Sequence, residues 1–161
     1  IGYNQTISQP TTVRRMMLWL APAIGQRVLD VGSGSGWSTA ILSYLVGSTG
    51  MVYGVERILS LKQFGEINCQ SIGCKNVLFF LADKSLGLAT HAPFDRILVS
   101  AAAADDIPAD LIDQLAPNGK LVIPVNHSIF ELQKNAQGGI AYCREHVGYV
   151  FVPLVENLDK T

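Results

Sequence analysis

The stretch that decides the fold is Val28-Leu-Asp-Val-Gly-Ser-Gly-Ser-Gly36, in which a short apolar run leads into three glycines at alternate positions. The following residues, Ser38 to Val46, have the apolar spacing of a helix, so we predict a strand, a tight turn and a helix. Glycine suits such a turn because it tolerates positive φ and has no Cβ to keep a ligand from the backbone. Free N–H groups at the start of the helix add donors. The turn therefore predicts a ligand site.

Two classes of cofactor use a turn of this kind. A dinucleotide site has the spacing G-x-G-x-x-G, but this chain has Trp37 where the third glycine would stand. The spacing G-x-G-x-G after an acidic residue, Asp30, suits a sulfonium cation with an amino-acid tail, because a carboxylate is a favourable neighbour for a cation. A P-loop is excluded, since no Gly-Lys-Ser or Gly-Lys-Thr follows. A turn that merely connects two elements is the alternative.

The alternation of strands and helices continues along the chain. Strands are predicted at Arg27 to Val31, Met51 to Val55, Val77 to Leu81, Phe94 to Ser100 and Lys120 to Val125. Helices are predicted between Pro10 and Pro22, and at Ser38 to Val46, Leu59 to Ile72 and Pro108 to Leu115. Repeated units of this kind give right-handed crossovers and a parallel sheet with helices on both faces.

The end of the chain follows a different pattern. Ile129 to Lys134 and Val147 to Val152 are two predicted strands with a turn at Gly138-Gly139 between them, as in an antiparallel hairpin. We therefore expect one α/β domain over residues 1–161, with a doubly wound, mostly parallel, Rossmann-like sheet and a C-terminal antiparallel hairpin. Since Val77 to Leu81 is apolar throughout, this strand is predicted to lie in the middle of the sheet.

The composition narrows the classes of function. The chain of 161 residues is 48% hydrophobic and 16% charged, which is typical of a folded domain, and its net charge of −1 argues against nucleic-acid or membrane binding. No apolar run is long enough to span a bilayer. Three cysteines fit neither a disulfide framework nor a zinc site, so we expect a cytoplasmic protein without a metal.

Two more acidic residues support the same ligand site. Glu56 stands at the end of the second strand, where a carboxylate can accept both hydroxyls of a ribose, and Asp83 follows the third strand at the same edge of the sheet. For Glu56 alone, a solvated surface residue is an equal alternative. His91, His127 and His146 lie in predicted loops without a partnered Ser or Cys, so no nucleophilic triad is predicted.

Several segments together resemble the protein-L-isoaspartate O-methyltransferase family. They are Ile1-Gly-Tyr-Asn-Gln-Thr-Ile-Ser-Gln-Pro10, VLDVGSGSG, GVERI, APFDRILVSAAA, GKLVIPV and FVPL, and they cover nearly the whole chain. QTISQP is much more specific than the glycine turn, which all class I methyltransferases share in some form. The resemblance implies transfer of a methyl group from S-adenosylmethionine to the α-carboxyl group of L-isoaspartyl residues in damaged proteins. Isoaspartyl peptides and proteins are then the expected partners, and the oligomeric state stays open.

The resemblance also implies roles for individual residues. The segment Gln5, Thr6, Ile7 and Ser8 is expected to border cofactor and substrate, with Ser8 at the position of the family's active-site serine. Cofactor contacts are expected from Asp30, Gly32, Gly34 and Gly36 in the methionine-binding turn, from Glu56 at the ribose, and from Asp83 and Lys84 at the adenine. Val152, Pro153 and Leu154 are expected to line the isoaspartyl peptide.

The chain also departs from the family pattern. Ala82-Asp83-Lys84 stands where the family usually has Gly-Asp-Gly, and losing the second glycine is expected to crowd the adenine. Asn4 replaces a frequent glycine, and the family's N-terminal helical segment is absent before Ile1. The alternatives are therefore a methyltransferase with another acceptor, and a truncated or degenerate domain with little or no activity.

Overall fold

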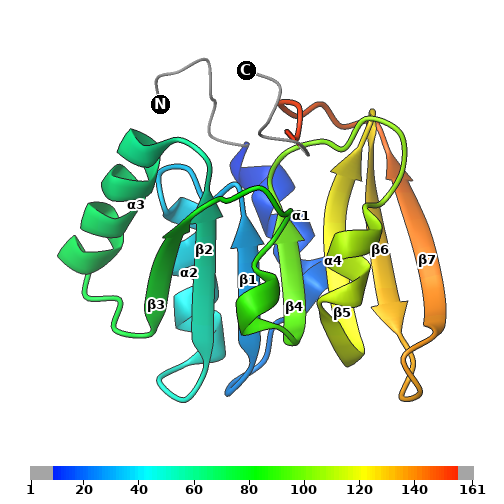
Figure 1. Ribbon diagram of the computed structural model, residues 1–161, viewed down its shortest axis with the longest axis horizontal. Helices are drawn as coiled ribbons and strands as arrows, with labels where there is room; N and C mark the ends of the chain where they lie inside the picture. The colour runs from blue at the N-terminus through cyan, green and yellow to red at the C-terminus, as the bar shows by residue number, and fades with distance from the viewer. Residues whose placement is uncertain (1–8, 156–161) are drawn as a thin grey trace.

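The computed structural model describes residues 9–155 and has one seven-stranded sheet with the order β3-β2-β1-β4-β5-β6-β7 (Figure 1). The first five strands run parallel and β6 and β7 run antiparallel, which confirms the predicted fold. The strands are β1 (Arg27–Val31), β2 (Met51–Glu56), β3 (Val77–Leu81), β4 (Phe94–Val99), β5 (Leu115–Val125), β6 (Ser128–Lys134) and β7 (Ile140–Val147). The helices are α1 (Pro10–Leu20), α2 (Trp37–Val46), α3 (Leu59–Ser71), the short η1 (Ala89–His91) and α4 (Ala109–Asp113).

One face of the sheet is covered by the longer helices. Pro10 occupies the first turn of α1, where its missing N–H costs nothing, and Val13, Met16 and Leu20 then fall on one buried stripe. They pack with buried residues of α2 and of the central strands in a single apolar cluster. In α2 the buried residues are Thr39, Leu42, Ser43 and Val46, whereas Ala40, Ile41 and Leu45 are only half-buried. Thr39 lies on the inner side, where its hydroxyl donates to the carboxylate of Asp30 on β1.

The opposite face has a thinner cover. Side chains such as Leu29, Tyr53 and Ile97 point to this side and pack against Leu111 of α4 and Leu86 of the segment after β3. The helix predicted over Pro108 to Leu115 is shorter here, because residues from Leu115 onward belong to β5. The segment Pro117-Asn-Gly119 forms an irregularity inside β5, where the register with β4 shifts and Asn118 has a φ of 60°.

The position predicted for β3 is wrong. Among the described residues this strand pairs with β2 alone and forms an edge of the sheet, and Leu78 and Leu81 are 46% and 48% exposed. Its other side chains are half-buried, and Phe80 packs against the core and against Tyr53. An apolar run therefore indicated a strand here but did not indicate how many neighbours the strand has.

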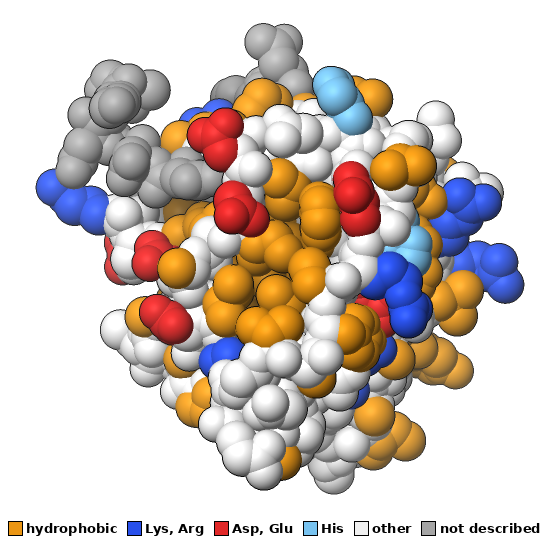
Figure 2. Space-filling view, turned by 90° about the vertical axis from the view of Figure 1, so that its right-hand side faces the viewer, with side chains coloured by type: hydrophobic (Ala, Val, Ile, Leu, Met, Phe, Trp, Pro, Cys, Tyr) orange, Lys and Arg blue, Asp and Glu red, His pale blue; other side chains and the backbone are white. Residues whose placement is uncertain are grey.

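The second strand of the hairpin was also predicted in the wrong place. The hairpin partner of β6 is Ile140–Val147 rather than Val147 to Val152. This strand is the other edge of the sheet. Six of its eight side chains are exposed, and Tyr142 and His146 are half-buried, in keeping with its polar sequence. Gly148 then turns the chain with a φ of 93°, and Tyr149 and Phe151 pack back toward α1. Figure 2 shows this edge, where apolar side chains gather near the centre of the surface with acidic side chains around them.

None of the helices in the described part of the chain has the length and apolar character needed to cross a membrane. Among the same residues, no group of three or more His, Cys, Asp or Glu side chains converges in a way that would hold a metal ion.

Candidate functional site

The glycine turn joins β1 to α2 and lies at the carboxyl end of the central strands. Gly32, Gly34 and Gly36 have φ values of 79°, 49° and 80°, which only glycine adopts without strain. Gly36 also packs directly on α3, since a Cβ there would lie 2.7 Å from the carbonyl oxygen of Gly65. Gly65 is equally restricted, because its own Cβ would lie 2.8 Å from the Gly34 carbonyl oxygen. The turn and α3 therefore fit together backbone to backbone.

Asp30 supports the turn from beneath. Its Oδ2 accepts hydrogen bonds from Ser38 Oγ at 2.8 Å and Thr39 Oγ1 at 2.7 Å, which fixes the first turn of α2 against β1. The side chain is fully buried and does not line the cavity described below. Burial raises the pKa of this carboxyl to about 6, although the two hydroxyl bonds oppose the shift and the charge of Glu56 adds to it. Oδ1 has no hydrogen-bond partner among the described residues.

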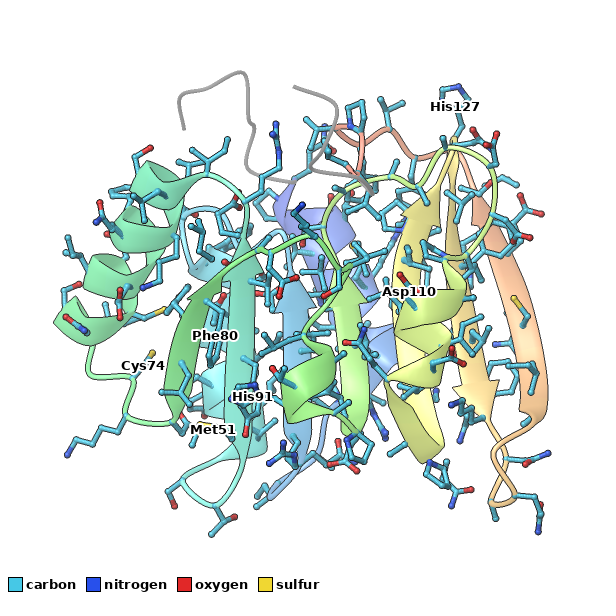
Figure 3. The ribbon with its side chains drawn as sticks, in the orientation of Figure 1. Met51, Cys74, Phe80, His91, Asp110 and His127 are labelled. Atoms are coloured by element: carbon cyan, nitrogen blue, oxygen red, sulfur yellow. The ribbon has the colours of Figure 1, made fainter. Side chains whose placement is uncertain are left out.

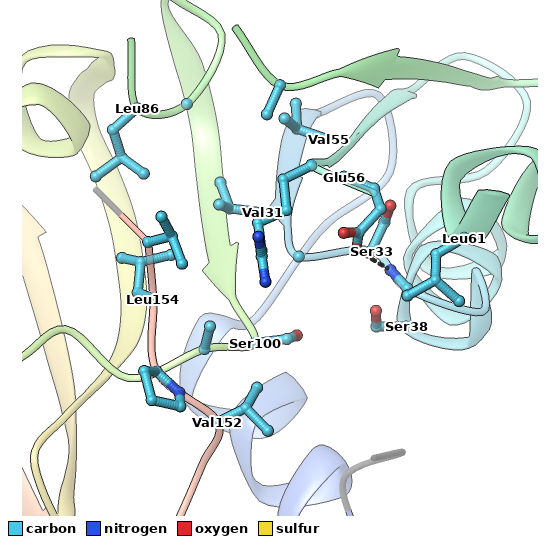
Figure 4. Close-up of a pocket in the computed structure, with 18 of the residues that line it drawn as sticks. Val31, Ser33, Ser38, Val55, Glu56, Leu61, Leu86, Ser100, Val152 and Leu154 are labelled. Carbon is cyan, nitrogen blue, oxygen red and sulfur yellow. Dashed lines mark hydrogen bonds between the residues drawn. The ribbon is translucent and has the colours of Figure 1, made fainter. Parts of the chain in front are cut away.

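Glu56 ends β2 beside the turn and is 7% exposed. Its Oε2 accepts the N–H of Gly34 at 3.0 Å, and its Oε1 accepts the N–H of Ile58 at 3.0 Å (Figure 4). Two backbone donors therefore hold the carboxylate at the edge of the cavity. Unlike Asp30, this acid faces the space in which a ligand would lie.

Asp83 lies at the same edge of the sheet but in a different environment. It is exposed, and its Oδ1 accepts hydrogen bonds from both the backbone N–H and the hydroxyl of Ser85. These bonds lower the pKa of Asp83. Asp83 lines the cavity, whereas the exposed Lys84 does not, so the predicted contact of Lys84 with a cofactor has no support in the geometry and stays a prediction.

These residues surround one open cavity at the carboxyl ends of β1 to β4 (Figure 4). The glycine turn and Glu56 form one wall, and the segment that contains Asp83 forms a second. The third wall comes from the C-terminal segment, where Val152, Pro153 and Leu154 line the cavity. Their predicted contact with an isoaspartyl peptide stays a prediction. Further lining residues that the sequence did not single out are Val13, Val31, Ser33, Ser38, Leu61, Ser85, Leu86 and Ser100.

The C-terminal wall is fixed by backbone hydrogen bonds. The N–H of Ala102 donates to the carbonyl of Val152 at 2.7 Å, and the N–H of Leu154 donates to the carbonyl of Ala102 at 2.7 Å. Ala101 also lines the cavity, and Ala103 is buried. The small side chains after β4 thus let a distant segment of chain approach the cavity closely.

A second cleft adjoins the first. It is lined by α1 and the C-terminal segment, including Gln9, Arg15 and Tyr149, and it shares Ser100 and Val152 with the cavity. The guanidinium of Arg15 donates to Tyr149 Oη at 2.8 Å. The two spaces therefore meet at Ser100 and Val152.

The segment Gln5 to Ser8 lies outside the described residues, so the roles predicted for Gln5, Thr6, Ile7 and Ser8 stay predictions. The most informative residue that the sequence reasoning missed is Gly65. A glycine inside a helix is a signal of close approach by another backbone, and here that backbone is the glycine turn. Neither His91 nor His146 lines the cavity, and His146 stacks on Trp19 at 3.8 Å instead.

Comparison with known proteins agrees with this arrangement. The family model described as protein-L-isoaspartate(D-aspartate) O-methyltransferase matches residues 1–159. The chain belongs to this family. Proteins named protein-L-isoaspartate O-methyltransferase from Methanosarcina mazei and Aeropyrum pernix are 41% and 42% identical to it, in each case over 96% of this chain.

The chain spans 64% and 61% of the length of these two members of the family. A solved structure named protein-L-isoaspartate O-methyltransferase aligns over 98% of this chain and 51% of its own, with a TM-score of 0.84 and 27% identity. A precorrin-6y C5,15-methyltransferase from Geobacter metallireducens aligns over 76% of this chain and 65% of its own, with a TM-score of 0.63 and 18% identity. The second likeness concerns the fold alone.

Proposed function

We propose that this protein transfers a methyl group from S-adenosylmethionine to the α-carboxyl group of L-isoaspartyl residues in damaged proteins, which begins their repair. The observation that carries the proposal is the joined pair of spaces in a member of this family: a cavity walled by the glycine turn and Glu56, and a cleft that meets it at Ser100 and Val152.

The cavity suits S-adenosylmethionine in its shape and its chemistry. The glycine turn leaves the backbone open to a ligand, and the buried carboxylate of Glu56 offers acceptor lone pairs to the hydroxyls of a ribose. Asp83, at the next strand end, accepts the Ser85 bonds through Oδ1, so its Oδ2 can accept a hydrogen bond from an adenine amino group. Asp30 contributes by holding the turn rather than by lining the cavity. When bound, the cofactor supplies a methyl group on an electrophilic sulfonium.

The acceptor half of the site needs little chemical activation. A carboxylate is already ionised at pH 7 and is its own nucleophile, so no general base is required. The work of the protein is to orient the two ligands and to exclude water. Val152, Pro153 and Leu154, fixed by their backbone bonds to Ala102, would border the isoaspartyl peptide on this side.

Ser8 and its neighbours Gln5, Thr6 and Ile7 are proposed to complete the site. They directly precede Gln9, which borders the second cleft, so the chain leads from this segment to the place where the peptide would lie. We assign Ser8 to positioning of the acceptor carboxylate rather than to covalent catalysis. Lys84 is proposed to contact the adenine end of the cofactor.

The proposal includes a cytoplasmic location and a protein or peptide partner rather than nucleic acid or a membrane. The cytoplasmic location is supported by an odd number of cysteines without the spacing of a metal site. The protein or peptide partner is supported by the net charge of −1, which gives no attraction to nucleic acid or an anionic membrane. One catalytic domain over residues 1–161 is part of the same proposal.

The direct test is transfer of radiolabelled methyl groups to a synthetic peptide that contains L-isoaspartate, with the same peptide containing ordinary aspartate as the control. We expect base-labile methylation of the first peptide alone. Equal labelling of both peptides, or transfer only to a small molecule or RNA, would point to a methyltransferase with another acceptor. Binding of S-adenosylmethionine weaker than millimolar would indicate a degenerate domain, for which the Ala82-Asp83-Lys84 sequence is the motivating feature.

A further inference from the structure

The C-terminal end of α3 brings two cysteines together. The helix ends in a Schellman motif, in which the N–H of Cys74 donates to the carbonyl of Cys69 at 3.0 Å and the N–H of Gly73 donates to the carbonyl of Gln70 at 3.0 Å. Gly73 has the positive φ of 81° that this motif requires. Figure 3 shows Cys74 in the segment between α3 and β3. In a Schellman motif the side chains of these two positions commonly touch, and here both carry thiols.

The geometry is compatible with a covalent bond between the two sulfurs. A direct backbone hydrogen bond of 3.0 Å limits the separation of the two α-carbons to less than about 7 Å. The α-carbons of a disulfide lie about 4.4 to 6.8 Å apart. Burial raises the pKa of the Cys69 thiol to about 12, and the neighbouring Cys74 adds to the shift, which agrees with two thiols in close contact.

Cys69 also touches the glycine turn. Its Sγ donates to the carbonyl oxygen of Gly36 at 3.4 Å, and a Cβ built on Gly36 would lie 3.1 Å from the same sulfur. The preceding residue of α3, Asn68, donates to the carbonyl of Ser35 at 2.9 Å. The end of α3 therefore supports the part of the turn that faces the cavity.

From this juxtaposition we infer that Cys69 and Cys74 form an intramolecular disulfide when the protein meets a hydroperoxide, and that the disulfide weakens ligand binding at the glycine turn. Cys74 is half-buried and Cys69 is buried, so the oxidant meets Cys74 first. In the oxidised form the Cys69 sulfur turns toward Cys74 and has no proton to donate to Gly36. The inference extends the proposed function, since it uses the cofactor as the ligand whose affinity changes.

The chemistry balances with hydrogen peroxide as the oxidant. The Cys74 thiolate attacks one peroxide oxygen, the O–O bond breaks, and the thiolate becomes a sulfenic acid while hydroxide leaves and takes up the thiol proton as water. The Cys69 sulfur then attacks the Cys74 sulfur, so that an S–S bond forms and the S–O bond breaks. The proton of Cys69 leaves with that oxygen as a second water. In a reducing compartment such a bond is transient and reports on oxidant.

The test uses the full chain with the exposed third cysteine removed by Cys143→Ser, so that this residue cannot link molecules, and the monomer is separated on a non-reducing gel before analysis. After treatment with hydrogen peroxide, free thiols are alkylated and the protein is cleaved with trypsin. Lys62 and Lys75 are the nearest cleavage sites, so both cysteines lie on one peptide. We expect this peptide to lack alkylation and to be lighter by two hydrogen atoms, and dithiothreitol to reverse the change. Alkylation of both cysteines after oxidation would overturn the inference.

Calorimetry with S-adenosylhomocysteine measures the consequence. Oxidation should weaken binding roughly fivefold, the size of one weak hydrogen bond, and reduction should restore it. The matched control adds Cys74→Ser, and its affinity should not respond to the same dose of peroxide. A disulfide that forms but leaves the affinity for S-adenosylhomocysteine unchanged would contradict the inference that oxidation weakens ligand binding at the glycine turn. If the reduced protein does not bind S-adenosylhomocysteine, the proposed function fails. The inference is then decided separately: the peptide mass shows whether the disulfide forms, and amide hydrogen exchange of residues 32–36 shows whether it changes the glycine turn.

Discussion

The two loops that follow β1 and β3 border the same cavity but differ in the environment of the acid that each one presents to it. The glycine turn after β1 is fixed by Glu56 from one side, by Gly65 of α3 from another, and from beneath through α2 by the buried Asp30. After β3, Asp83 itself is exposed and accepts two hydrogen bonds from Ser85, while Gln114 fixes the loop farther along, at Leu86 and Leu88. The first loop therefore presents a buried acid to a ligand, whereas the acid of the second loop is exposed to water. We therefore expect most of the binding free energy to depend on the first loop.

The largest effect is expected from Gly36→Ala. The new Cβ would meet the Gly65 backbone at 2.7 Å and would also require a positive φ. We expect a loss of about 3 to 5 kcal/mol in the free energy of unfolding, together with loss of ligand binding. Gly138→Ala is the matched control, since Gly138 has a φ of 87° but nothing within 4 Å of its Cβ, and it should cost only about 1 to 2 kcal/mol. Equal losses in denaturant titrations would show that backbone packing of the turn is unimportant.

The next effect concerns Glu56. Glu56→Gln keeps the shape of the side chain but removes the charge that accepts the Gly34 and Ile58 N–H groups and would accept the ribose. Affinity for S-adenosylhomocysteine should fall about 10- to 100-fold in calorimetry, as expected when a charge-assisted hydrogen bond is lost. Glu66→Gln is the control, because Glu66 pairs with Lys62 on α3 and does not line the cavity. An unchanged affinity for the Glu56 variant would remove this residue from the ligand site.

Asp30 provides a test through pH. Because burial raises its pKa to about 6 in the folded protein, against 3.8 for the ordinary carboxyl, the folded state binds more protons between these values. Its contribution to stability is therefore most favourable below about pH 4 and declines by about 2 to 3 kcal/mol as the pH rises to about 6. Denaturant titrations at several pH values should show this decline in the native protein relative to Asp30→Asn. Parallel pH profiles of the two proteins would contradict the assignment.

The smallest effect is expected from Asp83→Asn. Since this carboxylate is exposed and already bonded to Ser85, its loss should weaken binding of S-adenosylhomocysteine about threefold or less. The same calorimetric assay ranks it against the Glu56 variant. A loss as large as that of Glu56→Gln would mean that the two loops contribute equally, and the comparison between them would be wrong.

The sequence predicted the fold well because the fold depends on local patterns, whereas the roles of the site residues stay predictions. Three alternate glycines between a strand and a helix require a tight turn, and acids at successive strand ends must meet at one edge of a parallel sheet. It did not predict that β3 is an edge strand or that β7 is Ile140–Val147, because the number of neighbours of a strand depends on contacts distant in sequence.

The role of Asp30 shows the same limit at the site. The spacing placed it correctly beside the turn, but only the packing of α2 shows that its carboxylate bonds to Ser38 and Thr39 beneath the cavity. Ser100 is a second residue whose place the sequence did not reveal. It lines both the cavity and the second cleft, and the other walls of these two spaces come from segments far apart in the chain. Neither relation is present in any local pattern of residues.

The most direct test of the central claim is a crystal structure of the chain with S-adenosylhomocysteine. The account predicts that the ligand lies along the glycine turn, with its ribose hydroxyls within hydrogen-bond distance of the Glu56 carboxylate and its sulfur toward Ser100 and Val152, where the second cleft opens. Ligand density elsewhere, or a ribose that makes no contact with Glu56, would contradict it.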